Sequence, residues 1–288
     1  MPQTLTLASA ALRCTILPEL GGAVADLWFG DTAVLRNPPL ADIRTARQAS
    51  SYALVPFSNR VGQATLQWQG TSHPLVRNNA AEPHAIHGVG WQRPWTVLES
   101  DAESALLAYE HKADGSWPFA FDSSQAFRLR GNVLEMTLGI TNQSAAPAPV
   151  GLGWHPFFVK RSRSRIAFDA TGRWEMGPDK LPTHRAASHG LDAACAQLDV
   201  DHCFDGWNGT AHLRDEALHI VVTSSLRRLV VFTNDTRDTV AIEPVSHVNN
   251  AVNLLHAGGR SAEELGVCVL QPGESLSAQM GIAVEGVK

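Results

Sequence analysis

Two titratable residues in the sequence stand directly before prolines in apolar segments. His155 lies within GLGWHPFF, and Glu243 follows the apolar residues of VAIEP. Imidazole titrates near neutral pH, and burial raises the pKa of a glutamate toward the same range. The pair is therefore suited to proton transfer, in which one side chain donates while the other accepts.

The prolines also restrict the backbone conformation of His155 and Glu243. A residue before proline is restricted to extended backbone, and proline has no N–H for a sheet ladder, so strands tend to end or kink there. We expect His155 and Glu243 to project from strand ends on fixed backbone. The alternatives are a structural histidine in the core and a glutamate exposed at a strand end.

Two further polar segments precede this pair in the chain. SNRVG carries Asn59 and Arg60 just before an expected strand, with an ordinary surface turn as the alternative. PHAIHGVGW carries His84 and His87, followed by two glycines that allow the backbone to approach another group closely. Both segments are candidates for binding a ligand.

A metal site is the main alternative for the histidines. His84, His87, His155 and Glu243 include the ligand types of metal sites in β proteins. Two histidines three apart on a strand point to opposite faces, so both reach one ion only if PHAIH is a loop. The sequence also has no Gly-rich phosphate loop, dinucleotide fingerprint or Gly-x-Ser-x-Gly elbow. We therefore expect acid–base chemistry without a metal or cofactor.

A basic run, KRSRSR, follows His155 and contains Lys160, Arg161, Arg163 and Arg165. Arginines at this place are candidates for holding a phosphorylated substrate. The alternative is a solvated loop.

Composition excludes several classes of protein. The chain has 288 residues, 44% of them hydrophobic, and a formal net charge of −5, which allows a large core and gives no basic field for nucleic acid. Its four cysteines are widely spaced, so we expect reduced thiols rather than a disulfide framework or a zinc site. The sequence shows no signal peptide and no apolar run of membrane-spanning length. We expect a cytoplasmic protein, monomeric or homodimeric, without nucleic-acid or membrane partners.

Alternating apolar residues predict strands along the whole chain. The segment ALRCTIL places Leu12, Cys14 and Ile16 on one face, and AFRLRGNVLEMTLGITN predicts a hairpin with its turn at Gly131 and Asn132. LHIVVTS and TVAIEPV are typical of further strands, and NQSAAPAPVG reads as a loop within one domain. The sequence predicts an all-β protein, a large antiparallel β-sandwich in a single domain spanning residues 1–288.

Taken in chain order, these motifs resemble those of the aldose 1-epimerase (galactose mutarotase) family. The similar segments are SNRVG, IHGVGW, GWHPFF, VDHCF and IEPVSHVNNAVN. The resemblance implies a β-supersandwich that interconverts the α and β anomers of a monosaccharide. It implies that Glu243 is the base at the C1 hydroxyl and His155 the acid at the ring oxygen. Asn59, Arg60, His87 and Asp201 are then implied to hold sugar hydroxyls, with tryptophans such as Trp91 and Trp154 more typical of core packing.

The chain departs from the galactose-specific pattern just before Glu243. Galactose mutarotases usually have a Pro-Gly turn and a sugar-binding glutamine there, whereas this chain reads VVFTNDTRDTVAIEP. The identity of the sugar therefore stays open. The remaining alternatives are a hexose-6-phosphate mutarotase and a non-catalytic carbohydrate-binding protein of the same fold.

Overall fold

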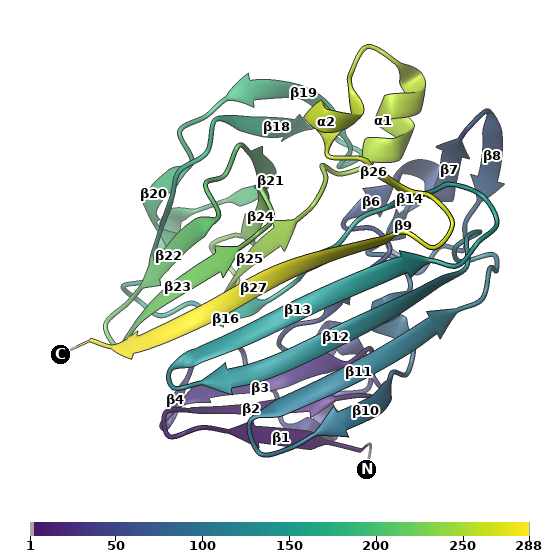
Figure 1. The fold of residues 1–288 in the computed structure, drawn as a ribbon. Coiled ribbons are helices and arrows are strands. Elements are labelled where there is room, and N and C mark those ends of the chain that lie inside the picture. Colours follow the sequence, from purple (N-terminus) through teal and green to yellow (C-terminus); the bar gives the residue numbers. More distant parts are fainter. Residues whose placement is uncertain (1–2, 288) are drawn as a thin grey trace.

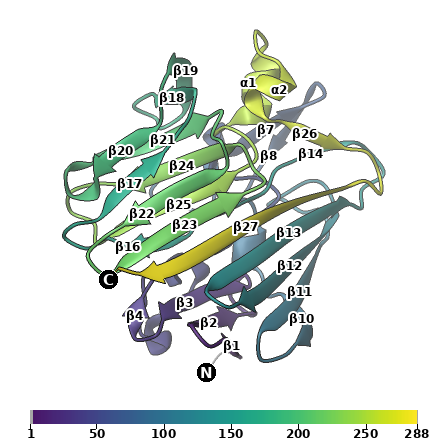
Figure 2. The ribbon, with the colours of Figure 1, turned by 60° about the vertical axis from the view of Figure 1, so that its left-hand side comes forward.

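A computed structural model describes residues 3–287 of the chain (Figure 1). Antiparallel strands dominate it, and most belong to two large sheets. This confirms the predicted all-β class, and Figure 2 shows the long strands of the larger sheet running side by side.

The larger sheet has nine strands. In spatial order they are β10 (Thr96–Ser100), β11 (Ser104–His111), β12 (Phe121–Arg130), β13 (Val133–Asn142), β27 (Ser275–Gly286), β23 (Leu218–Ser224), β22 (Thr210–Arg214), β17 (Arg165–Phe168) and β20 (Leu191–Ala194). The predicted hairpin is confirmed, because Arg130 pairs with Val133 across the Gly131–Asn132 turn. Gly131 has a positive φ of 59°, which glycine adopts without steric cost.

The second sheet has eight strands and carries the residues that matter for function. Its order is β19 (Pro182–Ala187), β18 (Gly172–Met176), β21 (Val200–Asp205), β24 (Arg228–Thr233), β25 (Thr239–Val245), β15 (Gly153–Trp154) and β5 (Ala53–Leu54), with β16 (Phe157–Val159) also pairing with β25. Every residue of β25 is buried.

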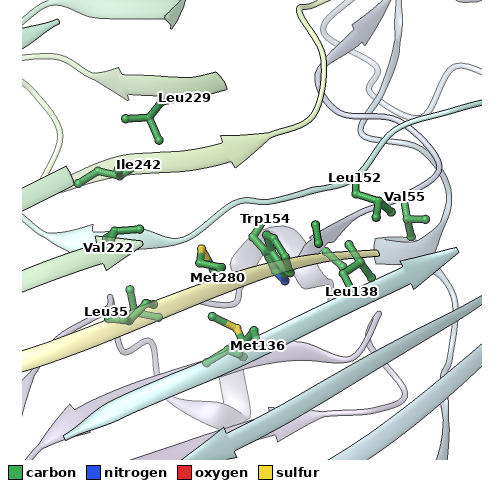
Figure 3. Close-up of a cluster of buried hydrophobic side chains, with 14 of the residues drawn as sticks. Leu35, Val55, Met136, Leu138, Leu152, Trp154, Val222, Leu229, Ile242 and Met280 are labelled. Carbon is green, nitrogen blue, oxygen red and sulfur yellow. The ribbon is translucent and has the colours of Figure 1, made fainter. Parts of the chain in front are cut away.

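The main hydrophobic core lies between the two sheets. Figure 3 shows Met136, Leu138 and Met280 of the nine-stranded sheet facing the same cluster as Leu229 and Ile242 of the eight-stranded sheet. A second apolar cluster covers the opposite face of the eight-stranded sheet. Because β25 is covered on both faces, its sequence reads as a continuous apolar run rather than a strict alternation.

Smaller elements complete the fold. A four-stranded sheet contains β1 (Leu5–Ala8), β2 (Leu12–Leu17), β3 (Ala23–Phe29) and β4 (Thr32–Ala33), and the two-stranded pairs are β6 (Arg60–Val61) with β9 (Ala85–Ile86), β7 (Thr65–Trp68) with β8 (Thr71–Pro74), and β14 (Ala148–Val150) with β26 (Cys268–Leu270). The short helices are α1 (Ala251–Ala257) and α2 (Ala262–Leu265), with 3-10 turns at Leu40–Asp42, Ala46–Gln48, Gly62–Ala64, Gly90–Gln92 and Cys195–Gln197. The segment NQSAAPAPVG, expected to be a loop, thus forms β14 at its C-terminal end.

The state of the cysteines and the length of the helices can be compared with the sequence analysis. The four cysteines are free thiols, and three of them are buried, in agreement with the sequence. Within residues 3–287, the helices are too short or too polar to cross a bilayer.

Candidate active site

A cavity of about 350 Å³ opens on the face of the eight-stranded sheet that lies away from the main core. It is lined by all six residues singled out in the sequence: His155, Glu243, Asn59, Arg60, His87 and Asp201. Five separate parts of the fold contribute them, namely the start of β6 with the residue before it, the residue after β9, the break after β15, and strands β21 and β25. The sequence segments that are far apart therefore meet at one site.

Register places His155 against Glu243. Gly153 of β15 pairs with Val245 of β25, and Phe157 of β16 pairs with Ala241 of β25. His155, which lies midway between Gly153 and Phe157, therefore stands opposite Glu243 of β25. Nε2 of His155 lies 3.2 Å from Oε1 of Glu243, and both side chains are more than nine-tenths buried. The backbone N–H of His155 donates to the carbonyl of Tyr52 (3.0 Å), which ties the break to the end of β5.

The strand-end expectation is right for His155 and wrong for Glu243. His155 directly follows β15, but Glu243 lies inside β25, and its neighbour Pro244 is paired with Leu229. The N–H groups of Ile242 and Ser246 donate toward the β15–β16 side, to Pro156 and Leu152. Backbone N–H groups of every second residue point to the same neighbouring strand, so the nitrogen of Pro244 also faces the β15–β16 side. The partner strand is interrupted at this point, so β25 continues although proline has no N–H to donate.

Aromatic rings enclose His155. The ring of Tyr52 lies 5.0 Å from it and that of Phe157 4.4 Å, while His87 meets it edge-on at 5.2 Å. Burial lowers the pKa of His155 well below its usual value, and the nearby His87 and Arg36 add to this effect. The neutral imidazole is therefore favoured in the closed site.

Glu243 lies in a comparably buried place. Burial raises its pKa well above the usual value, with the charge of Asp201 adding to this and Arg60 opposing it. Burial thus favours a neutral carboxyl beside a neutral imidazole, a state in which the pair holds one proton. Oε2 of Glu243 and Nδ1 of His155 are buried and have no hydrogen-bond partner within residues 3–287, so both retain capacity for a further polar contact.

Asn59 and His87 are joined by two hydrogen bonds. The N–H of Asn59 donates to Nδ1 of His87 (3.1 Å), and the N–H of His87 donates to the carbonyl of Asn59 (2.8 Å). Because Nδ1 accepts, the neutral ring carries its proton on Nε2. Burial, with Arg60 and Arg47 nearby, lowers the pKa of His87 to about 3, so this ring is a neutral donor at pH 7.

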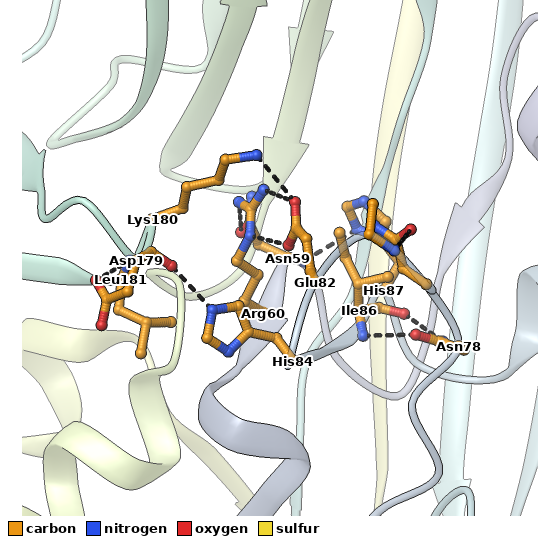
Figure 4. A network of polar contacts seen from close by, with 12 residues as sticks. Asn59, Arg60, Asn78, Glu82, His84, Ile86, His87, Asp179, Lys180 and Leu181 are labelled. Atoms are coloured by element: carbon orange, nitrogen blue, oxygen red, sulfur yellow. Dashed lines mark hydrogen bonds and ion pairs between the residues drawn. The ribbon is translucent and has the colours of Figure 1, made fainter.

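Arg60 is held by an ion pair that the sequence did not predict. Its Nε and Nη2 donate to the two carboxylate oxygens of Glu82 (2.6 and 2.8 Å), and its Nη1 donates to Oδ1 of Asn59 (3.0 Å). Lys180 also contacts Glu82, at 3.1 Å (Figure 4). These cations hold the pKa of Glu82 at about 2. The guanidinium of Arg60 is thus fixed in orientation at the cavity wall.

The two glycines after His87 bring this segment against β5. A Cβ on Gly88 would lie 2.2 Å from the carbonyl oxygen of Val55, and one on Gly90 would lie 2.4 Å from Cγ1 of the same residue. Gly88 also has a positive φ of 69°. The close backbone approach predicted from the sequence is confirmed, and it is made to Val55 rather than to a ligand.

Three groups of candidate residues lie outside the cavity. Nδ1 of His84 accepts from the N–H of Gln63 (3.0 Å), and its Nε2 lies 2.8 Å from the carbonyl of Asp179, so His84 is a buried structural histidine. Within residues 3–287, no cluster of three His, Cys, Asp or Glu side chains is arranged to hold a metal ion. Trp91 and Trp154 are buried, as core packing predicts.

The basic run KRSRSR does not reach the cavity either, so its suggested role in holding a substrate phosphate is wrong. Arg161 pairs with Asp215 (2.8 Å) and Arg165 with Asp192 (2.7 Å), while Lys160 donates to the carbonyl of Asn234. These contacts use the basic side chains to join neighbouring strands and loops.

Sequence reasoning missed Tyr52, Glu82 and Arg36, which also line the cavity. Glu82 carried the same signal as His155 and Glu243, because it too directly precedes a proline. Tyr52 is one of only two tyrosines in the chain. Arg36, in VLRNPP, carried no comparable signal.

A pocket of this size, with a histidine in contact with a carboxyl and neutral and charged donors beside it, is suited to acid–base chemistry on a small polar molecule. The family model described as aldose 1-epimerase matches residues 3–283. The protein belongs to this family.

A curated relative and several solved structures are similar over nearly the whole chain. The uncharacterized protein YphB of Escherichia coli (strain K12) is 30% identical, over 97% of this chain and 98% of its own length. The crystal structure of a putative aldose 1-epimerase from E. coli K12 is similar, with a TM-score of 0.88, 29% identity and 99% of each chain covered. A galactose mutarotase-like protein from Clostridium acetobutylicum shares the fold, with a TM-score of 0.85 and 21% identity over 99% of this chain and 95% of its own.

Proposed function

We propose that the protein is a mutarotase that interconverts the α and β anomers of an aldose by acid–base ring opening and closure. The observation that carries the proposal is the contact between Nε2 of His155 and Oε1 of Glu243, 3.2 Å apart in the wall of a polar cavity. In a cyclic aldose the C1 hydroxyl and the ring oxygen are bonded to the same carbon. An acid and a base that act on them must therefore lie side by side, as these two residues do.

The reaction moves one proton at each residue. Glu243, as carboxylate, takes the proton from the C1 hydroxyl while protonated His155 gives its proton to the ring oxygen, and the C1–ring oxygen bond breaks. The products are an open-chain aldehyde, a neutral carboxyl and a neutral imidazole. After rotation about the C1–C2 bond the two residues reverse roles, and the ring closes on the other face of the aldehyde.

Burial of the pair supports this cycle. The protonation state reached on ring opening, neutral Glu243 and neutral His155, is the one that burial favours. The reactive state differs from it by transfer of a single proton between two adjacent atoms. Each group contributes ~10² to 10⁴ in rate as a positioned acid or base, and the proposed steps call for no metal or cofactor.

The other residues of the cavity are proposed to bind the sugar. His87 offers an Nε2–H donor, and Arg60, clamped by Glu82, offers a fixed positive charge to an oxygen that becomes negative. Asn59 and Asp201 supply an amide and a carboxylate for hydroxyl groups. Together they would hold the substrate while C1 rotates.

Polarimetry of freshly dissolved α-D-glucose, α-D-galactose and α-D-xylose tests the proposal, since each sugar relaxes slowly to its anomeric equilibrium in buffer. The protein is expected to accelerate relaxation of at least one sugar in proportion to its concentration. Saturable sugar binding without acceleration would instead establish a carbohydrate-binding protein of the same fold.

A further inference from the structure

The charges around the cavity are unevenly distributed between its two ends. Arg60 and Asp201 are the charged groups that act on Glu243, whereas Arg36 and Arg47 act on His155. The Glu243 end thus has charges of both signs, and the His155 end has only arginines among the charged groups that act on it. This excess of positive charge occurs in a chain whose net charge is −5.

Arg36 is fixed beside His155. Its guanidinium lies 3.7 Å from the ring centroid of Phe157, whose ring packs against His155. Nε donates to the carbonyl of Ala49 (2.8 Å), and Nη2 donates to carbonyls of the same turn. Burial lowers its pKa to about 10, which still leaves it charged at pH 7. Backbone carbonyls orient the group without neutralising it.

Arg237 extends this positive region. It comes from the turn between β24 and β25, lies 4.2 Å from the ring centroid of Phe232, and is close enough to Arg36 to lower the pKa of that residue. Asp238, in the same turn, acts on the pKa of Arg36 with the opposite sign and more strongly than Arg237 does.

Arg47 is the third member of the group. It reaches over Trp91 and donates to Oδ1 of Asn79 (3.3 Å). Within residues 3–287, none of the three guanidinium groups forms an ion pair with a carboxylate, whereas Arg60 and Lys180 share Glu82. Arg36, Arg47 and Arg237 form an arginine rim.

The order of atoms in a pyranose ring determines which substituent lies next to the arginine rim. With Glu243 at the C1 hydroxyl and His155 at the ring oxygen, the next atom of a hexopyranose ring beyond that oxygen is C5, which carries C6. The side of His155 away from Glu243 is therefore the side of C6. We propose, resting on the mutarotase function above, that the substrate is an acidic aldose whose C6 carboxylate or phosphate binds the arginine rim.

Matched sugars test this inference directly. The rate of anomer exchange, measured by NMR, is compared for glucose, glucuronate and glucose 6-phosphate, and for galactose, galacturonate and galactose 6-phosphate. We expect kcat/KM for at least one acidic sugar to exceed that of its neutral parent by about tenfold or more, because charge-assisted hydrogen bonds are strong. The better of the carboxylate and phosphate arms identifies the anion. The preference should shrink at high ionic strength.

A charge-matched pair of variants links the preference to the rim. Arg237→Gln removes an exposed rim guanidinium that donates no hydrogen bond to residues 3–287, and we expect it to lower the acidic-to-neutral ratio of kcat/KM about tenfold. Arg163→Gln changes the net charge equally, outside the cavity, and should keep the wild-type ratio.

The outcomes separate the inference from the function on which it rests. Equal acceleration of acidic and neutral sugars, or equal ratios in the two variants, would overturn the arginine rim as a specificity site and leave mutarotation standing. No acceleration of any sugar in the panel would overturn both.

Discussion

His155 stands opposite Glu243 in the register of β25, at the break between β15 and β16. Each residue is held by backbone on both sides, because β15 and β16 pair with the same strand before and after the break. The acid and the base of the proposed reaction are therefore positioned by the sheet itself rather than by mobile loops. A rigid sheet suits this chemistry, since both groups must meet atoms that share one carbon.

Replacing Glu82 with Gln should impair substrate binding more than the chemical step. The change removes the carboxylate that fixes Arg60 through two hydrogen bonds, while His155 and Glu243 keep their contact. We expect KM to rise about tenfold, with a smaller fall in kcat, in steady-state mutarotation assays.

Glu216→Gln is the control for this variant, because Glu216 is exposed and bonds Ser162 and the N–H of Arg163 away from the cavity. Unchanged KM in Glu82→Gln would contradict a positioning role for the ion pair. A folded variant with kcat reduced and KM unaltered would assign Glu82 to the chemistry instead.

The close approach of the His87 segment to β5 predicts a large difference between two glycine substitutions. Gly88 and Gly131 both have positive φ, but only at Gly88 would a Cβ meet backbone, the carbonyl of Val55. Both substitutions by Ala carry the cost of a left-handed conformation. The difference between their free energies of unfolding therefore measures the cost of the collision with the carbonyl of Val55. Urea unfolding should show Gly88→Ala less stable than Gly131→Ala by about 1 to 3 kcal/mol. Equal stabilities would show that the segment relaxes freely.

Stability should fall as pH is lowered from 7.0 to 5.5. His87 and His247 have pKa values of about 3 and about 4 in the folded protein against 6.5 in the unfolded chain, both chiefly through burial. Their folded pKa values are depressed, so the unfolded chain binds more protons below pH 6.5, and acid favours unfolding. The linkage relation gives about 1 kcal/mol for each histidine over this interval.

The neutral–neutral state that burial favours for the catalytic pair holds one proton, the same number that its two members together hold in the unfolded chain between pH 4.5 and 6.5. We therefore expect the pair to add little to this pH slope. His247→Gln isolates one contribution, and its loss of stability between pH 7.0 and 5.5 should be about 1 kcal/mol smaller than that of the wild type. An identical loss in the two proteins would show that His247 is protonated in the folded state.

Much of the fold and several residues of the cavity were readable from local patterns. The Gly131–Asn132 turn formed where turn chemistry predicted it, and β25 formed at the apolar, β-branched run TVAIEPV, because short-range backbone preferences decide both. The Xaa-Pro signal marked His155 and Glu243, and it would have marked Glu82 as well.

What the sequence did not reveal depends on long-range pairing. The ion pair of Arg60 with Glu82 joins separate segments, and nothing near Arg36 indicates that its guanidinium reaches Phe157. KRSRSR misled because the local density of charge does not show which side chains are already paired. Arg237, from the segment that departs from the galactose-specific pattern, lines the cavity instead.

The most direct test of the central claim is the polarimetric relaxation rate of the preferred sugar with wild type, Glu243→Gln and a matched Glu175→Gln. Glu175 pairs with Arg173 outside the cavity, so its change controls for loss of one carboxylate. We predict that Glu243→Gln folds with unaltered circular dichroism and loses ~10² to 10⁴ of the acceleration, while Glu175→Gln retains the wild-type rate. A Glu243→Gln protein that accelerates relaxation as fast as the wild type would contradict the assignment of the His155–Glu243 pair as acid and base.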